Sequence, residues 1–211
     1  LDDDGVCDFS LLSFGNHNIE NKTIEIRYNF FEEVQGVQFD ISGFDNIVSA
    51  TQDNAIVLTG NQSGSAGDTT DCNDDGVINI EDIILSIGSE CENTWVEYSH
   101  FIMSGNTVVV VKYPGTGELL GEGILTTLTY DNISENITIL NNATIVRLLD
   151  NGQVVQGNLY ADENGIVDQI SHEQDCNGDY YGSAIEDCAG VCGGDTVVDD
   201  CGVCGGSGIP E

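Results

Sequence analysis

Basic residues are almost absent from this chain. Its 211 residues include 4 Lys and Arg against 37 Asp and Glu, which gives a formal net charge of -33. Nucleic-acid binding is excluded on this ground, because the phosphates of nucleic acids are neutralised by Lys and Arg. An anionic membrane surface would repel the chain for the same reason. The few bases are Lys22, Arg27, Lys112 and Arg147.

Long apolar runs are absent as well. No stretch approaches the roughly 18 consecutive apolar residues that a membrane-spanning helix needs, so we expect no direct membrane insertion. Apolar residues still make up 40% of the chain, which is enough for a packed core.

Recognisable catalytic motifs are missing too. The histidines His17, His100 and His172 stand in no triad, HExxH pattern or zinc-ligand spacing. The chain has no phosphate-binding loop and no GxSxG motif, and its carboxylates are too numerous for any one pair to be informative. We therefore expect that the protein is not an enzyme.

Short runs of alternating apolar and polar residues make up much of the chain. In TIEIRYNF, the side chains of Ile24, Ile26, Tyr28 and Phe30 fall on one face of a strand. About ten such runs, with turn signals roughly every 8 to 12 residues, predict an all-β fold, an antiparallel sandwich. The runs are TIEIRYNF, VQGVQFDI, NIVSA, AIVLT, WVEYSHFIM, TVVVVKY, GILTTLTYD, ITIL, ATIVRLL and QVVQGNLY.

Residues 61–94 break this strand pattern and contain the spacing of a calcium loop. A Gly- and Ser-rich linker precedes DCNDDGVINIEDI, which has oxygen ligands at the EF-type positions and Gly76 at the sharp turn. Isoleucines from Ile80 to Ile87 then recur at helical spacing. The alternative is an Asn- and Asp-rich turn without an ion. The predicted calcium ligands are Asp71, Asn73, Asp75, Val77 through its carbonyl, Asn79 and Asp82.

A second loop with this spacing begins at Asp175, although Tyr180 stands where glycine is expected. No helical pattern follows it. The predicted calcium ligands here are Asp175, Asn177, Asp179, Tyr181 through its carbonyl, Ser183 and Glu186.

The eight cysteines predict a disulfide framework and an oxidising compartment. Cys72 and Cys91 flank the first calcium loop, and we expect them to form a disulfide. Five more lie in repeats of 12 to 13 residues, with Asp-Cys at 175–176, 187–188 and 200–201. Zinc binding is the alternative for the last four cysteines, and redox chemistry is the alternative for the last two. The spacing leaves open the partners of Cys7, Cys176, Cys188, Cys192, Cys201 and Cys204.

Two family resemblances converge on a surface protein. GVQFDISGFDNIVSA, SGNTVVVVKYPGTGELLGEGILTTLTYD and ATIVRLLDNGQVV resemble the cohesin-like domains of large secreted bacterial surface proteins. This resemblance implies a jelly-roll or immunoglobulin-like sandwich that binds partner modules and catalyses nothing. The calcium loop and its isoleucine stripe resemble half of a dockerin module. The Asp-Cys-Gly repeats are distantly similar to thrombospondin type 3 calcium repeats.

These observations predict three parts: a sandwich over 1–60 and 95–170, a calcium loop-helix insert over 61–94, and an irregular, disulfide-rich tail over 171–211. We expect an extracellular, calcium-stabilised structural or adhesive module, a filament subunit that assembles with copies of itself head to tail. The alternative is a monomeric module that binds a dockerin-like or carbohydrate partner. Sequons for N-glycosylation occur at Asn21, Asn61, Asn132, Asn136 and Asn142.

Overall fold

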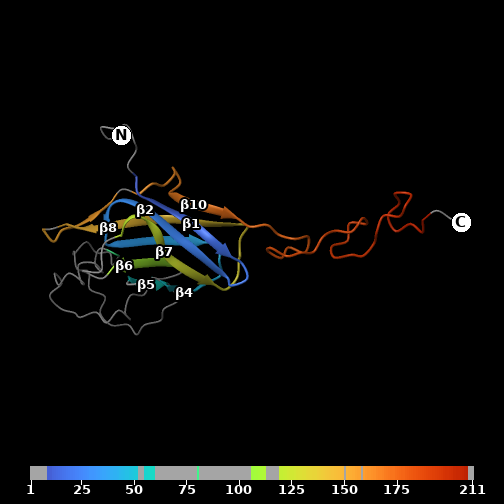
Figure 1. Cartoon of the computed structure of the whole chain (residues 1–211), viewed down its shortest axis with the longest axis horizontal. Coiled ribbons are helices and arrows are strands. Elements are labelled where there is room, and N and C mark those ends of the chain that lie inside the picture. The colour runs from blue at the N-terminus through green and yellow to red at the C-terminus, as the bar shows by residue number, and fades with distance from the viewer. Residues whose placement is uncertain are drawn as a thin grey trace. The chain divides into compact units, whose positions relative to one another are not determined.

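Ten strands run through the described part of the computed structural model, which covers residues 9–51, 55–59, 80, 106–112, 119–149, 151–157 and 159–208. Figure 1 shows their arrangement. In the strands over residues 23–34 and 36–42, buried side chains alternate with less buried ones, as in a sheet with one covered face. The strands are β1 (Leu11–Asn18), β2 (Thr23–Val34), β3 (Gly36–Ser42), β4 (Ile47–Thr51), β5 (Ala55–Thr59), β6 (Thr107–Lys112), β7 (Leu119–Tyr130), β8 (Ile137–Leu148), β9 (Val154–Gln156) and β10 (Ile166–Ser171).

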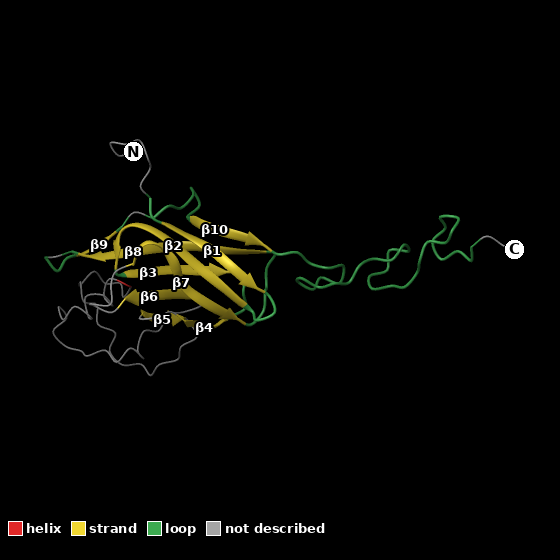
Figure 2. Cartoon of the chain, viewed as in Figure 1, coloured by secondary structure: helices red, strands yellow, loops and turns green. Residues whose placement is uncertain are grey.

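Two sheets form the sandwich (Figure 2). The first has the strand order β1-β2-β7-β4, and the second has the order β10-β8-β3-β6-β5 with β9 paired to β8. The strand pairings whose registers are resolved are antiparallel. The predicted all-β sandwich is therefore confirmed by the chain's own strand pairing.

The core lies between the two sheets and is built from the inward residues of each. Ile24, Ile26 and Phe30 of β2 face Val37 and Phe39 of β3 across it, and all five side chains are buried. Burial of such side chains contributes about 1.5–3 kcal/mol each. The sandwich thus has the apolar core that the 40% apolar composition predicts.

Strand β6 is buried on both of its faces. Val108 and Val110 belong to the core, and Val109 and Val111, which point the other way, are buried too. This explains its unbroken TVVVVK sequence, since a strand covered on both sides needs no polar alternation. Ile80, the one described residue of the predicted insert, is also buried. The second sheet is therefore covered over β6.

The strand predictions were wrong in three places. ITIL and ATIVRLL are one strand, β8, in which Asn142 adopts a positive φ of 47° and the register with β3 shifts nearby. The polar residues between the two predicted runs, within what is one strand, have the composition of a turn. None of the predicted runs covers β1 or β10, and Asp168 of β10 accepts a hydrogen bond from the backbone N–H of Phe14 in β1.

The chain divides into two compact units, 1–170 and 171–211. In the second unit, His172 is the one buried residue among those described. An apolar core cannot hold such a segment together, so other interactions must do so. Among the residues that the structure describes, no helix is long and apolar enough to cross a membrane.

Candidate functional site: the cysteine repeats

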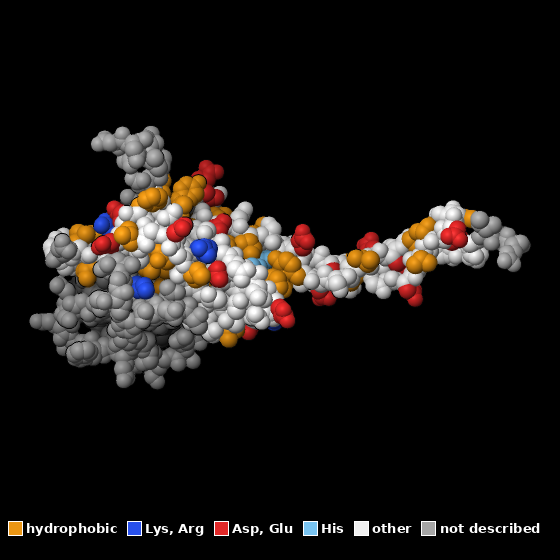
Figure 3. Space-filling view, in the orientation of Figure 1, with side chains coloured by type: hydrophobic (Ala, Val, Ile, Leu, Met, Phe, Trp, Pro, Cys, Tyr) orange, Lys and Arg blue, Asp and Glu red, His pale blue; other side chains and the backbone are white. Residues whose placement is uncertain are grey.

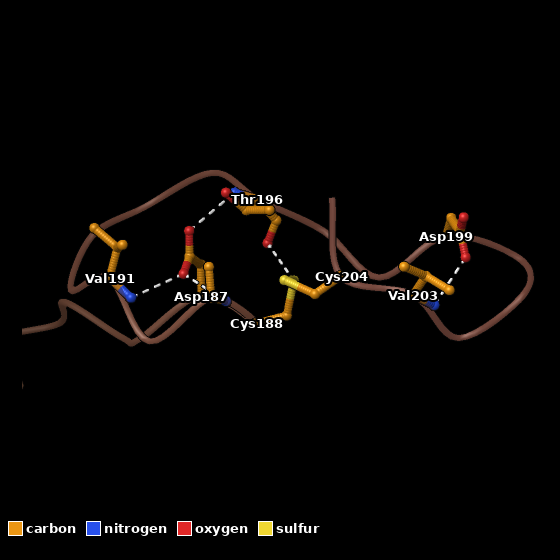
Figure 4. The surroundings of a disulfide bond; sticks show 8 residues. Asp187, Cys188, Val191, Thr196, Asp199, Val203 and Cys204 are labelled. Carbon is orange, nitrogen blue, oxygen red and sulfur yellow. Dashed lines mark hydrogen bonds between the residues drawn. A yellow bond between two sulfur atoms is a disulfide. The ribbon is translucent and has the colours of Figure 1, made fainter. Parts of the chain in front are cut away.

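An aspartate-centred loop is the building block of the second unit. The Oδ1 atom of Asp187 accepts hydrogen bonds from the backbone N–H groups of Ala189 and Val191, each at 2.9 Å. Its Oδ2 atom accepts one from Thr196 at 3.2 Å (Figure 4). The backbone N–H of Asp187 also donates to the carbonyl of Val191 at 2.9 Å. One carboxylate thus closes a loop and ties it to the segment that follows.

The same loop recurs every twelve residues. Asp175 and Asp199 accept hydrogen bonds from the N–H groups two, four and nine positions further on, at 2.9–3.1 Å. A glycine with positive φ stands three residues after each aspartate, where an L side chain would be strained. Beyond Ser171, the described residues form no strand or helix, yet their hydrogen bonding is regular.

A fourth copy of the loop lies ahead of the repeats, in the turn that leads into β10. Asp162 accepts hydrogen bonds from the N–H groups of Asn164 and Ile166, both at 2.8 Å, and Gly165 has a φ of 76°. The sequence D-x-x-G marks all four loops. Sequence reasoning missed this copy because no cysteine accompanies it, although the Asp-to-Gly spacing was visible.

Two disulfides connect successive repeats. Cys176 pairs with Cys192, and Cys188 pairs with Cys204, each across 16 positions. Each bridge therefore spans one twelve-residue repeat and four residues of the next. The disulfide framework predicted for these cysteines is confirmed. The connectivity that the sequence left open joins each repeat to the next, and the two bridges are here called the disulfide ladder.

The alignment of the third repeat on Asp200-Cys201 was wrong. The carboxylate that closes this loop belongs to Asp199, so Cys201 lies one position later in its repeat than Cys176 and Cys188 do in theirs. It is an exposed free cysteine. The doubled aspartate before it made the shift invisible in sequence, because either aspartate could begin the repeat.

Aromatic residues take the place of one of the two cysteine positions in the first repeat. Tyr180 occupies the position that Cys192 and Cys204 hold in the later repeats, and its ring lies edge-on to buried His172 at 6.1 Å. The Nδ1 atom of His172 lies 2.8 Å from the hydroxyl of Tyr181, within hydrogen-bond distance. Burial lowers the pKa of His172, so the ring is held neutral.

Tyr181 has a φ of 55°, a conformation that Gly193 and Gly205 adopt at the equivalent positions. A bulky residue there stores about 1 kcal/mol of strain or more, which the surrounding contacts must offset. The cluster of His172, Tyr180 and Tyr181 therefore anchors the start of the repeats without a disulfide.

The loop hydrogen bonds also set the acidity of the aspartates. The N–H of Val191 lowers the pKa of Asp187, and the N–H of Val203 does the same for Asp199. At Asp175, desolvation raises the pKa, but hydrogen bonds led by the N–H of Asp179 outweigh it and the net shift is downward. All three carboxylates are therefore held ionised by the loops they close.

The second predicted calcium loop uses Asp175 differently from what the calcium spacing suggests. Three backbone N–H groups occupy three of the roughly four lone-pair sites of its carboxylate. Asp187 and Asp199 hold the same geometry, although valine follows at the fifth position of each loop. Among the described residues, no group of three or more His, Cys, Asp or Glu side chains gathers around a metal-sized site. Calcium at Asp175 stays a prediction.

The first calcium loop, Asp71 to Asp82, lies outside the described residues except for Ile80, as do Cys7, Cys72, Cys91 and His100. Its ligand set and the Cys72–Cys91 disulfide stay predictions. His17, the remaining histidine, places Nε2 2.7 Å from the hydroxyl of Tyr130.

Four of the five sequons are described. The side-chain amide of Asn142 donates to Asp40 at 2.9 Å, and that of Asn132 donates to Asp45 at 3.3 Å. A glycan on either amide would take one of its two N–H positions and leave the other as a donor. Asn21 and Asn136 are exposed, and Asn61 lies outside the described residues. Glycosylation itself stays a prediction.

Exposed aliphatic side chains recur along the repeats. Ile185 and Val197 occupy equivalent positions in successive repeats, and so do Val191 and Val203. Their exposed fractions lie between 56% and 78%, and Val198 is 55% exposed. The repeats thus combine a covalent ladder, ionised aspartates and a periodic set of apolar side chains that the second unit itself does not bury.

The chain was compared with protein families, curated proteins and solved structures. Neither protein-family models nor curated proteins match the chain. Among solved structures, a cohesin module from a family 33 glycoside hydrolase of Clostridium perfringens ATCC13124 is similar at 13% identity and a TM-score of 0.33, over 72% of this chain and 90% of that one. An uncharacterised Nocardia farcinica protein with an immunoglobulin-like fold is similar at 8% identity and a TM-score of 0.37, over 78% of this chain and 98% of that one.

Proposed function

We propose that this protein is an extracellular structural module whose cysteine repeats connect it to the next copy, so that subunits assemble head to tail. The observation that carries the proposal is the periodic exposure of Ile185, Val191, Val197 and Val203 on a segment that has no core of its own. Exposed apolar groups that recur with a structural period are typical of surfaces that bind a partner.

The disulfide ladder supports both the location and the role. Disulfides of this kind persist in oxidising surroundings such as the cell exterior. They hold the repeats in shape before any partner binds, which reduces the conformational entropy lost on association. A pre-shaped connecting segment suits a structural assembly.

Head-to-tail association is heterologous, because one copy contributes the repeats and the other contributes its sandwich. Such a contact leaves a free surface at each end and extends into a filament unless it closes into a ring. Calcium in the loop from Asp71 to Asp82 would stabilise the insert and reduce the self-repulsion of a chain with net charge -33. This calcium site rests on the sequence alone.

Electron microscopy of the full chain and of a chain ending at residue 170 tests the proposal. The full chain should form filaments, and the shortened chain should stay monomeric with the circular dichroism of a folded β-sandwich. Filaments of the same repeat from the shortened chain would show that the repeats are not the connector. A full chain that binds a separate partner as a monomer would favour the alternative binding module.

The calcium part has its own test. Isothermal titration should detect calcium binding to the full chain, and Asp71→Ala with Asp75→Ala should abolish the heat of binding at the first loop. Unchanged titration of the double variant would remove that loop as the site.

A further inference from the structure

An exposed row of large apolar side chains crosses one end of the first sheet. Phe9, Phe31, Leu120 and Tyr160, here called the apolar row, are between 45% and 52% exposed. On the sandwich, hydrophobic side chains lie exposed among polar ones in the view of Figure 3. Large apolar side chains that gather on a surface mark an interaction site more reliably than scattered ones.

The strand registers place Phe9, Phe31 and Leu120 at the same end of the first sheet. Phe31 and Leu120 follow the paired residues Phe30 and Gly121 of β2 and β7, where the register shifts. Phe9 lies just beyond the first pair of β1 and β2, Leu11 with Asn29, toward the same end.

Tyr160 completes the row on the other side of Phe9. The ring centroids of Phe9 and Tyr160 are 6.2 Å apart, and the backbone N–H of Tyr160 donates to the carbonyl of Ser10 at 2.9 Å. With strands about 4.8 Å apart, the row is on the order of 15 Å long.

We propose that the apolar row is the docking site for the cysteine repeats, residues 171–208, of a second copy of this chain. This inference rests on the head-to-tail assembly proposed above and assigns the surface that receives the repeats. The second sheet offers less free surface, because Val109 and Val111 of β6 are already buried on its outer side.

The size of the row fits a narrow occupant. Half-exposed aromatic side chains offer roughly 100 Å² each, so three of them and a half-exposed leucine present on the order of 300–400 Å². A stable interface between two globular faces needs about 800 Å² from each partner. A slender segment that also contacts neighbouring polar residues is the better match.

The chemistry of the row fits aliphatic side chains. The rings of Phe9 and Tyr160 are inclined at 61° to each other, so they do not form the flat platform on which a sugar chain would stack. The repeats supply Ile185, Val197 and Val198, which are 55% to 78% exposed. Branched aliphatic groups pack well against inclined rings.

Matched variants of the full chain test the docking site. The row variant carries Phe31→Asp with Leu120→Asp, and the repeat variant carries Val197→Asp with Val198→Asp. Val48→Asp is the control, because Val48 is 53% exposed on β4 of the same sheet but lies outside the row. Mass photometry should show that each double variant needs an at least tenfold higher concentration than the wild type to associate, while the control does not.

Mixing the two double variants gives the sharper result. The row variant keeps intact repeats and the repeat variant keeps an intact row, so their equimolar mixture should form dimers that neither forms alone. A mixture that stays monomeric while the wild type polymerises would overturn the proposed contact.

A cross-linking measurement on an otherwise unchanged chain removes any doubt about folding of the variants. Tyr160→p-benzoylphenylalanine should cross-link to residues 171–208 of another copy, which isotope-mixed chains and mass spectrometry distinguish from the same copy. Cross-links to sandwich residues, or within one copy only, would overturn the docking site. Wild-type polymers with an unaffected row variant would remove the row but keep the assembly, whereas a monomeric wild type would overturn both.

Discussion

Removing one rung of the disulfide ladder should unfold its repeat and leave the sandwich intact. The change is Cys188→Ser with Cys204→Ser, which opens a closed loop of 16 positions. Loop-closure entropy predicts a loss of about 3 kcal/mol for a loop of this length. No apolar core in the described residues of 171–208 replaces it, because His172 alone is buried there.

Native-state hydrogen exchange measures this loss directly. The amides of Val191, Thr196 and Val203 donate to the aspartates of the affected loops. A loss of about 3 kcal/mol should speed their exchange by roughly a hundredfold. The exchange of the sandwich core should not change.

Cys201→Ser is the matched control, because this cysteine is free and exposed. It should leave exchange in the repeats as it is. Protection of the three amides within about tenfold of the wild type in the double variant would show that the hydrogen-bonded loops hold without the bridge.

Three further predictions concern acidity, the core and the thiols. The pKa values of Asp187 and Asp199 are lowered, so their stabilising effect should be complete above the ordinary value of about 3.9 and disappear as the pH falls through the folded-state values. Loop amide shifts in an NMR titration would show this, and amide shifts that change with a midpoint at or above about 3.9 would contradict it. Phe30→Ala should lower the free energy of unfolding, measured with denaturant, by about 3–5 kcal/mol because Phe30 is buried. Val48→Ala, at an exposed position, should change it by about 0.5 kcal/mol or less, and equal effects of the two variants would refute the assigned core. Iodoacetamide should label Cys201 without reductant, and peptide mass spectrometry that finds this residue unmodified would place it in a bridge.

Alternation was sufficient to predict the sandwich because burial on one face leaves a period of two in the sequence. Strand β2 follows this pattern closely, with Ile24, Ile26 and Phe30 in the core. The pattern failed where local chemistry resembled a turn. The Asn141-Asn142 pair inside β8 has the composition of a turn, and the pairing of β8 with β3 and β9 is what keeps the strand continuous.

The repeats were visible as a spacing, but their structural frame was not. The frame is defined by a carboxylate that accepts hydrogen bonds from the backbone N–H groups two, four and nine residues further on. Where two aspartates are adjacent, as at Asp199 and Asp200, the sequence does not tell which of them makes these contacts. The pairing of cysteines across 16 positions follows from how one loop stacks on the next. The apolar row was likewise hidden, because its members are far apart in the sequence and the strand pairing is what brings them to one end of the sheet.

Sedimentation velocity of the full chain over a range of concentrations tests the central claim most directly. Head-to-tail assembly predicts boundaries that move faster as the concentration rises and continue past the dimer, since each added copy leaves a free docking surface. A single monomer boundary at every concentration, or a closed dimer that does not grow, would contradict the account.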